Sequence, residues 1–357
     1  MVTALSFLII LSLLILVHEG GHFLMAKKAG IKVEEFGFGL PPRIFGKRIG
    51  ETIYSINLFP LGGFVRLYGE EGIVKEDRSR SFSAKSKATR IGILLAGVMM
   101  NLLLAIVLFC FVYSFLGIPE KGEKITILSV MSNSPAIQAG LEEKDIIASV
   151  DGQAVKEIDQ FITFIKEKTG QLVVLEIERG GDSSQLEKFS VELKPREHPP
   201  EGEGAIGVVI SDTQIKHYPF YQIIPKAIYN GVLEALFWMK EMVIVLKSIL
   251  VSIWHGGGLP QGVAGPVGIY QATDQVSKQG VWALIHFTGI LSINLAVFNL
   301  IPFPALDGGR IVFVFLENFL GKKKRQRVER WINTAGMVFL LLFLFLITIN
   351  DIKRFVK

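Results

Sequence analysis

The chain has 357 residues, a formal net charge of +5 and one cysteine; half of its residues are hydrophobic and 20% are charged. Its mean hydropathy of +0.44 is too high for an ordinary soluble protein, in which about 25% of residues are charged. These values exclude a disordered chain, a disulfide-stapled secreted domain and a nucleic-acid binder.

The first apolar stretch, residues 1–26, carries a single charge, Glu19. It has no basic leader and no small-residue cleavage site, so it predicts a retained membrane helix. Residues 18–22 read HEGGH. Histidines four apart share one helix face, where both imidazoles reach one metal ion and the glutamate can act as a general base. The alternative, a pair of satisfied core histidines, would leave Glu19 buried without a partner.

Residues 27–90 form a predicted cytoplasmic loop region. Within it, residues 36–68 are rich in glycine, proline and aromatic side chains. We expect this segment to be β-rich and associated with the membrane, where non-helical backbone is tolerated only if protein or water satisfies its polar groups. The second predicted span, residues 91–118, has no charge and contains Cys110, which we interpret as a small buried apolar side chain.

Residues 122–212 predict a small soluble module. Expected strands are residues 124–130, 171–178 and 205–210, and expected helices are residues 134–140 and 158–168. The order of strand, SPAIQAG, DII, DG, helix and strand resembles a bacterial PDZ domain. Lys144 stands where such domains usually have glycine before Asp145. Because no clear carboxylate-binding loop follows, the sequence leaves open whether the module binds peptide C-termini or acts as a size filter.

Residues 213–280 are predicted to link this module to the third span. Residues 225–254 within the linker are apolar but interrupted by five charged side chains. We interpret them as an amphipathic helix at the membrane interface, with a further span as the alternative.

The third predicted span, residues 281–316, contains Asp307 and Arg310 and is interrupted near its end by two prolines; the fourth is residues 332–350. A catalytic zinc ion usually has three protein ligands. Asp307 is the only acidic residue in the last three spans, and its predicted depth matches that of the two histidines. We therefore expect it to be the third ligand, with a helix cap paired to Arg310 as the alternative.

Charge predicts the orientation of the spans. Residues 25–90 hold 13 Lys/Arg against 7 Asp/Glu, and residues 317–331 hold 6 against 2. Residues 117–225 hold 11 Lys/Arg against 18 Asp/Glu. The basic loops should therefore face the cytoplasm, which places both termini and the PDZ-like module outside and the metal site toward the cytoplasmic side.

Several motifs together resemble the site-2 protease family, and most closely its bacterial branch of RseP/RasP-type intramembrane zinc metalloproteases, here with a single PDZ-like domain. They are HEGGH, PLGG at residues 60–63, the PDZ-like insert, GPVGI at residues 265–269, and the segment 294–309 with its LDGG ending. The resemblance implies a multi-pass α-helical protein of the bacterial inner membrane, with four transmembrane helices, a membrane-associated β-rich loop and an inserted α+β domain.

The resemblance also implies one Zn²⁺ ion bound by His18, His22 and Asp307, with Glu19 as the base. It implies that Asn294 and Asn299 hold the substrate backbone, although hydrogen bonding between helices is an alternative role for both.

The expected activity is that of a zinc-dependent intramembrane endopeptidase. Its partners would be the lipid bilayer and single-pass membrane substrates, such as anti-sigma factors or signal-peptide remnants, and not nucleic acid; the oligomeric state stays open. One alternative is a catalytically inactive membrane scaffold with a PDZ domain, which predicts no bound zinc. A transporter would show inverted repeats, which the sequence does not show. The position of HEGGH inside an apolar run argues against an anchored peptidase for soluble substrates.

Overall fold

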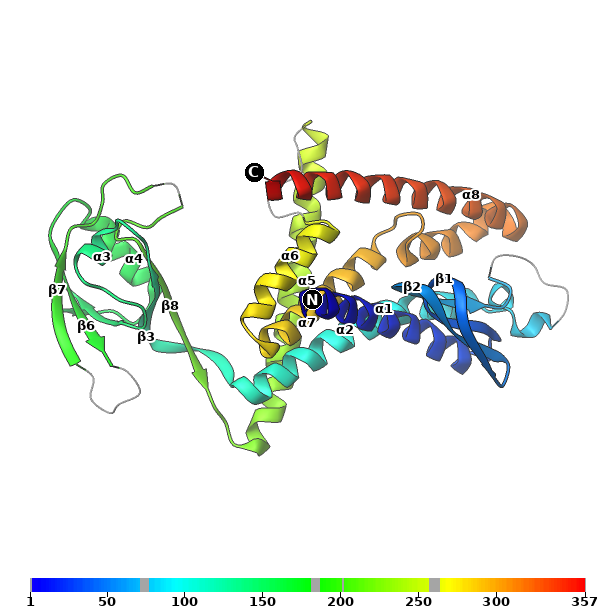
Figure 1. Cartoon of the computed structure of the whole chain (residues 1–357), viewed down its shortest axis with the longest axis horizontal. Helices are drawn as coiled ribbons and strands as arrows, with labels where there is room; N and C mark the ends of the chain where they lie inside the picture. The colour runs from blue at the N-terminus through cyan, green and yellow to red at the C-terminus, as the bar shows by residue number, and fades with distance from the viewer. Residues whose placement is uncertain (1, 71–76, 181–186, 201, 257–263, 357) are drawn as a thin grey trace. The chain divides into compact units, whose positions relative to one another are not determined.

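The computed structural model describes residues 2–70, 77–180, 187–200, 202–256 and 264–356, and these form two compact units (Figure 1). The helical unit comprises Met1–Phe115 and Tyr221–Lys357, and the insert unit comprises Leu116–Phe220. The insert therefore interrupts the helical unit once, between its second and third long helices.

The helical unit contains a two-stranded β-ribbon, short 3₁₀ turns and six α-helices in its described residues. The helices are α1 (Val2–Lys28), α2 (Lys87–Leu116), α5 (Phe220–Trp254), α6 (Pro266–Lys278), α7 (Val281–Leu300) and α8 (Asp307–Val356), and the strands are β1 (Val33–Ile49) and β2 (Thr52–Leu67).

Four helical segments of the described chain are long and apolar enough to cross a membrane. They are Thr3–Lys28, Lys87–Leu116, Val281–Leu300 and Val328–Lys353. The 35-residue helix α5, which carries five charged side chains, is not among them. The chain thus has the four apolar helices of a multi-pass membrane protein.

The predicted third span, residues 281–316, is divided in the structure. Helix α7 ends at Leu300, Ile301 is extended, and α8 begins at Asp307. Proline at position 302 lacks the amide that would continue the helix. The turn folds back closely on the new helix, since a Cβ at Gly309 would lie 2.1 Å from the Phe303 carbonyl oxygen. Glycine at position 309 therefore allows α8 to begin immediately after the turn.

The β-ribbon, β1 with β2, lies against α1 (Figure 1). Its register is irregular, so that the first half of β1 lies between two segments of β2: Gly37 pairs with both Phe64 and Ser55. The second half of β1 pairs with β2 on one side only, from Arg43 opposite Asn57 to Ile49 opposite Thr52. The ribbon is therefore a small sheet folded from two long strands.

Helix α5 is held to α2 and α7 by one carboxylate. Glu234 lies 2.6 Å from His286 Nε2 on α7 and accepts a hydrogen bond from the Tyr113 hydroxyl on α2. Trp238, one turn along α5, donates its indole N–H to the same carboxylate. A polar cluster of this kind fixes the rotation of α5, because all of its donors point to one group.

The C-terminal end of α8 holds the start of α6. Asp351 is buried, and its Oδ2 accepts from the amides of Gly265 and Gly268, each at 2.9 Å. The GPVGI motif thus forms a helix N-terminus that is capped by a carboxylate from a distant part of the chain.

The insert unit is a six-stranded sheet with two short helices. Its strands run in the order β7-β6-β4-β3-β8, and β5 pairs with β4. The elements are β3 (Ile118–Val130), α3 (Pro135–Gln138), β4 (Ile146–Val150), β5 (Gln153–Ala154), α4 (Ile158–Glu167), β6 (Val173–Arg179), β7 (Glu187–Leu193) and β8 (Val208–Lys216). Side chains such as Ile127, Phe161 and Leu175 form a core of its own.

The local signals of the insert unit are present in the structure. Ser134 caps α3 by accepting from the Ile137 amide at 3.2 Å. Lys144 has a φ of +73°, which explains why glycine suits this position in the domains it resembles. The buried Asp145 that follows accepts two hydrogen bonds from Arg179, at 2.6 and 2.7 Å.

Candidate metal centre

The two histidines of HEGGH occupy one face of α1. His18 and His22 are 6% and 7% exposed, and their rings meet edge to face with centroids 4.8 Å apart. Their Nε2 atoms are 3.2 Å apart. One turn of helix thus brings two imidazole nitrogens to a common point inside an apolar helix.

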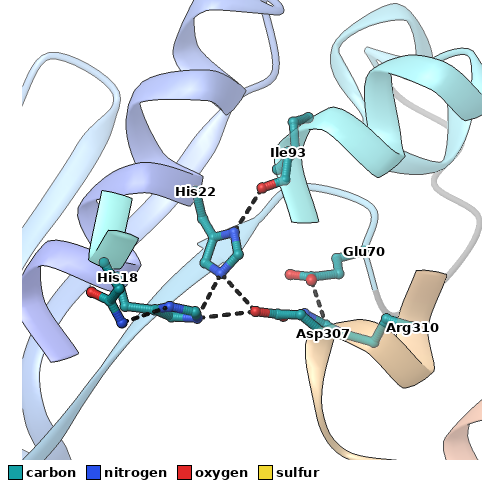
Figure 2. Close-up of polar contacts among 7 residues, drawn as sticks. His18, His22, Glu70, Ile93, Asp307 and Arg310 are labelled. Carbon is teal, nitrogen blue, oxygen red and sulfur yellow. Dashed lines mark hydrogen bonds and ion pairs between the residues drawn. The ribbon is translucent and has the colours of Figure 1, made fainter. Parts of the chain in front are cut away.

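Asp307 reaches the same point from the first residue of α8. Its Oδ2 lies 3.0 Å from His18 Nε2 and 3.2 Å from His22 Nε2, and Figure 2 shows the three side chains converging. Arg310 is not its partner: the guanidinium lies 2.5 Å from the Glu70 carboxylate instead. The alternative of an Asp307–Arg310 pair is therefore not seen.

The donor set fits a zinc ion. Two imidazole nitrogens and one carboxylate oxygen are ligands that zinc takes in catalytic sites. With bonds of about 2.0–2.1 Å, tetrahedral ligand atoms lie about 3.3 Å apart, close to the separations of 3.0–3.2 Å seen here. These three are the only group of His, Cys, Asp and Glu side chains in the described chain arranged to hold a metal ion.

Helix α2 forms a close wall behind the histidines. His22 Nδ1 lies 2.8 Å from the Ile93 carbonyl oxygen. A Cβ at Gly97 would lie 2.6 Å from His22 Nε2, and a Cβ at Gly21 would lie 2.4 Å from the Ala96 carbonyl oxygen. The second glycine of HEGGH therefore serves the approach of another backbone. The first, Gly20, has nothing within 4 Å of its Cβ position.

Glu19 lies beside the β-ribbon. A Cβ at Gly63 would be 3.5 Å from Glu19 Cγ and 3.3 Å from Ile15 Cγ2. Nearby, the Ser12 hydroxyl donates to the Pro60 carbonyl at 3.4 Å. The Glu19 carboxylate makes no hydrogen bond or ion pair with the residues that the structure describes.

The two asparagines predicted to bind substrate lie on α7. Asn294 and Asn299 are both half-buried, and neither side-chain amide has a hydrogen bond to the described residues. The alternative of interhelical hydrogen bonding is thus not observed for either. They do not belong to the group of three side chains that could hold a metal ion.

Sequence reasoning missed the contribution of α2 and the ion pair of Arg310 with Glu70. The only sequence signal for a contribution of α2 was the pair Gly97 and Asn101, which lie four residues apart in a run of mostly large apolar side chains. Nothing in the sequence connected Glu70 with residues near Asp307.

Comparison with known proteins places these features in context. The chain matches the model of Peptidase family M50 over residues 6–343. A Clostridium perfringens protein that carries a zinc metalloprotease name is 36% identical over 97% of both chains. A second, from Clostridium acetobutylicum, is 33% identical over 95% of this chain and 94% of its own length. The zinc metalloprotease RasP of Oceanobacillus iheyensis is 29% identical over 99% of both.

Among solved structures, the PDZ domain of an SdrC-like protein from Listeria monocytogenes matches 27% of this chain and 93% of its own, with a TM-score of 0.22 and 25% identity. The corresponding domain from Listeria innocua matches 27% of this chain and 97% of its own, with a TM-score of 0.20 and 29% identity.

Proposed function

Because the chain belongs to peptidase family M50 and is a site-2 type zinc metalloprotease, we propose that it hydrolyses peptide bonds within or near the transmembrane segments of single-pass membrane proteins. The observation that carries the proposal is the convergence of His18, His22 and Asp307 on one point, with both histidines inside an apolar helix long enough to cross a membrane. A peptidase for soluble substrates would not need its metal ligands within a membrane-spanning helix, where ionisable side chains are costly.

One zinc ion would be held by His18 Nε2, His22 Nε2 and Asp307 Oδ2, and when bound it supplies a Lewis acid. Glu19 follows His18 directly and has no partner of its own among the described residues. Its carboxylate takes a proton from the attacking water and delivers it to the leaving amide nitrogen. The burial of the three ligands excludes bulk water and keeps the donor set oriented.

The β-ribbon provides a surface for an unwound substrate. A membrane helix hides its carbonyl groups in internal hydrogen bonds, so a segment must become extended before it is cut. Gly63 of the ribbon lies beside Glu19, and the ribbon has edges at which an extended peptide can pair. In this proposal the ribbon is membrane-associated and aligns the substrate past the metal ligands.

Asn294 and Asn299 are proposed to bind the substrate backbone. Both amides lack hydrogen bonds to the described residues, and a side-chain amide offers a donor and an acceptor to a peptide group. This role would replace the internal hydrogen bonds that the substrate loses when it unwinds.

The four apolar helices and the relatives fit a protein of the bacterial inner membrane. We further propose that both termini and the insert unit, which resembles a PDZ domain, face outward, with the active site toward the cytoplasm. Anti-sigma factors and signal-peptide remnants are substrates of suitable architecture.

The test is to map the cleaved bond. Purified protein is incubated in detergent with a single-span test substrate that contains a Gly-Pro step in its span, and with a matched substrate in which both residues are leucine. Mass spectrometry should place the cut inside the span, the leucine substrate should react more slowly, and a zinc chelator should stop both reactions. Cleavage only outside the span would reject intramembrane proteolysis, and equal rates would reject unwinding.

A further inference from the structure

A fully buried amide stands directly behind the metal-binding histidines. Asn101 lies on α2, and its Nδ2 is 3.4 Å from His18 Nδ1. Its side-chain oxygen Oδ1 is buried and has no hydrogen-bond partner among the described residues. Gly97, one helical turn earlier, faces the same pair of rings. An unpaired buried amide oxygen is costly, so its presence at this position requires an explanation.

The His18 ring determines what its neighbour must provide. His18 Nε2 faces Asp307 and the other histidine, so the metal side of the ring is fixed. The proton of a neutral imidazole then resides on Nδ1, and that N–H needs an acceptor. The Asn101 nitrogen is only a donor, whereas its oxygen is an acceptor. A half-turn of the amide exchanges the two atoms without a change in shape. It places Oδ1 against the His18 N–H and gives the orphan oxygen its partner.

The second histidine already has an acceptor at its Nδ1 atom. His22 Nδ1 lies 2.8 Å from the carbonyl oxygen of Ile93, also on α2. Ile93, Gly97 and Asn101 are spaced by four residues and so share one face of that helix. One face of α2 thus offers an acceptor to each ring, a main-chain carbonyl for His22 and a side-chain amide for His18.

The backbone of Asn101 is itself held in place. Ser292 on α7 is fully buried, and its hydroxyl donates to the Asn101 main-chain carbonyl at 2.8 Å. The amide therefore projects from an anchored part of α2, and the contact with Ser292 does not involve the side chain.

We propose that Asn101 is a positioning residue of the metal centre: its amide oxygen accepts the Nδ1 proton of His18 and so directs Nε2 toward the metal. The proposal rests on the function proposed above, because it takes His18 as a zinc ligand. Removal of such outer partners typically weakens metal binding by about 10–100-fold.

The test measures zinc affinity rather than turnover. Full-length protein in detergent is stripped of metal and titrated with zinc against a chromophoric chelator. The variants are Asn101→Leu, which keeps the volume but has no acceptor, and Asn101→Asp, which keeps acceptor oxygens. Ser292→Ala is the matched control, since it disturbs the same helix contact without touching the side-chain amide.

We expect Asn101→Leu to weaken zinc binding by about 10–100-fold, while Asn101→Asp binds zinc as tightly as the wild type. Ser292→Ala, which removes only the contact with the main chain of Asn101, should weaken zinc binding far less than Asn101→Leu does. Rescue by aspartate separates an acceptor role from packing. If Asn101→Leu cannot be purified folded, Asn101→Ala is compared with Asn101→Asp in the same way. If Asn101→Leu binds zinc as tightly as the wild type, the positioning role of Asn101 is rejected, but the metal centre is not. A wild type that binds no zinc would reject the metal centre itself.

Discussion

At the scale of single residues, the proposed metal centre combines a local pair of histidines with one distant carboxylate. His18 and His22 are brought together by one turn of α1, whereas Asp307 comes from the start of α8, 289 residues after His18. The carboxylate should contribute strongly to the affinity for a cation, since it is the only charged member of the donor set.

Asp307→Asn should therefore abolish tight zinc binding. Asparagine keeps the shape but loses the charge, and the loss of affinity should exceed the roughly 10–100-fold effect of outer partners. Zinc content and chelator competition measure it. Asp351→Asn is the matched control, because Asp351 is also a buried aspartate of α8 but caps α6. Equal zinc binding by wild type and Asp307→Asn would contradict the ligand assignment.

Residue-level reasoning reached the three clustered side chains because each has a local signal in the sequence. The HEGGH spacing alone predicts two imidazoles on one face, and an isolated carboxylate at a helix break predicts the third ligand. Asn101 and Ile93 could not be found in this way. Their role depends on which face of α2 packs against α1. The spacing of residues within either helix does not determine that packing.

At the scale of elements, the crossing of α1 and α2 decides whether the site can form. The backbone of α2 at Ala96 approaches Gly21 so closely that no side chain fits between them. The neighbouring Gly20 faces open space. The two glycines of one motif therefore have different roles.

Gly21→Ala should lower the thermal stability of the protein and its zinc content, because the new methyl group would meet the Ala96 carbonyl. Gly20→Ala should leave both intact, and alanine should favour the helix by about 1 kcal/mol. Thermal unfolding in detergent and metal analysis compare the pair. A Gly21→Ala variant as stable and as zinc-replete as Gly20→Ala would contradict the close crossing.

Element prediction was limited by packing and register. The helix break after Leu300 follows from the prolines, and the cap at Ser134 follows from its local sequence. The β-ribbon is different: the sequence predicts a β-rich segment there, but not that Gly37 pairs on both sides. Glycine-rich strands specify register weakly, so the final arrangement depends on α1, against which the ribbon lies.

At the scale of the whole molecule, the insert unit has its own core and is connected to the helical unit through β3 and β8. Lys121 and Thr213 pair across these two strands. The chain therefore leaves and re-enters the unit at adjacent points. A domain joined in this way can be removed without separating the flanking helices, so its proposed role as a size filter can be tested by deletion.

Deletion of residues 122–212 should permit cleavage of substrates with intact outer domains, which the full chain rejects. Because Lys121 and Thr213 are neighbours, a two-residue turn can join them. Cleavage is compared for trimmed and untrimmed forms of one substrate, and activity on the trimmed form shows that the shortened protein is folded. Unchanged rejection of the untrimmed form would rule out a size filter.

Glu19 is proposed to perform proton transfer beside a zinc ion inside the helical unit. The most direct measurement compares wild type with Glu19→Gln on one single-span substrate in detergent, with zinc content determined for both. We expect about one zinc in each and cleavage by the wild type alone, since glutamine preserves the ligands but cannot accept the proton. Cleavage by Glu19→Gln at the wild-type rate, or folded wild type without zinc, would contradict this role.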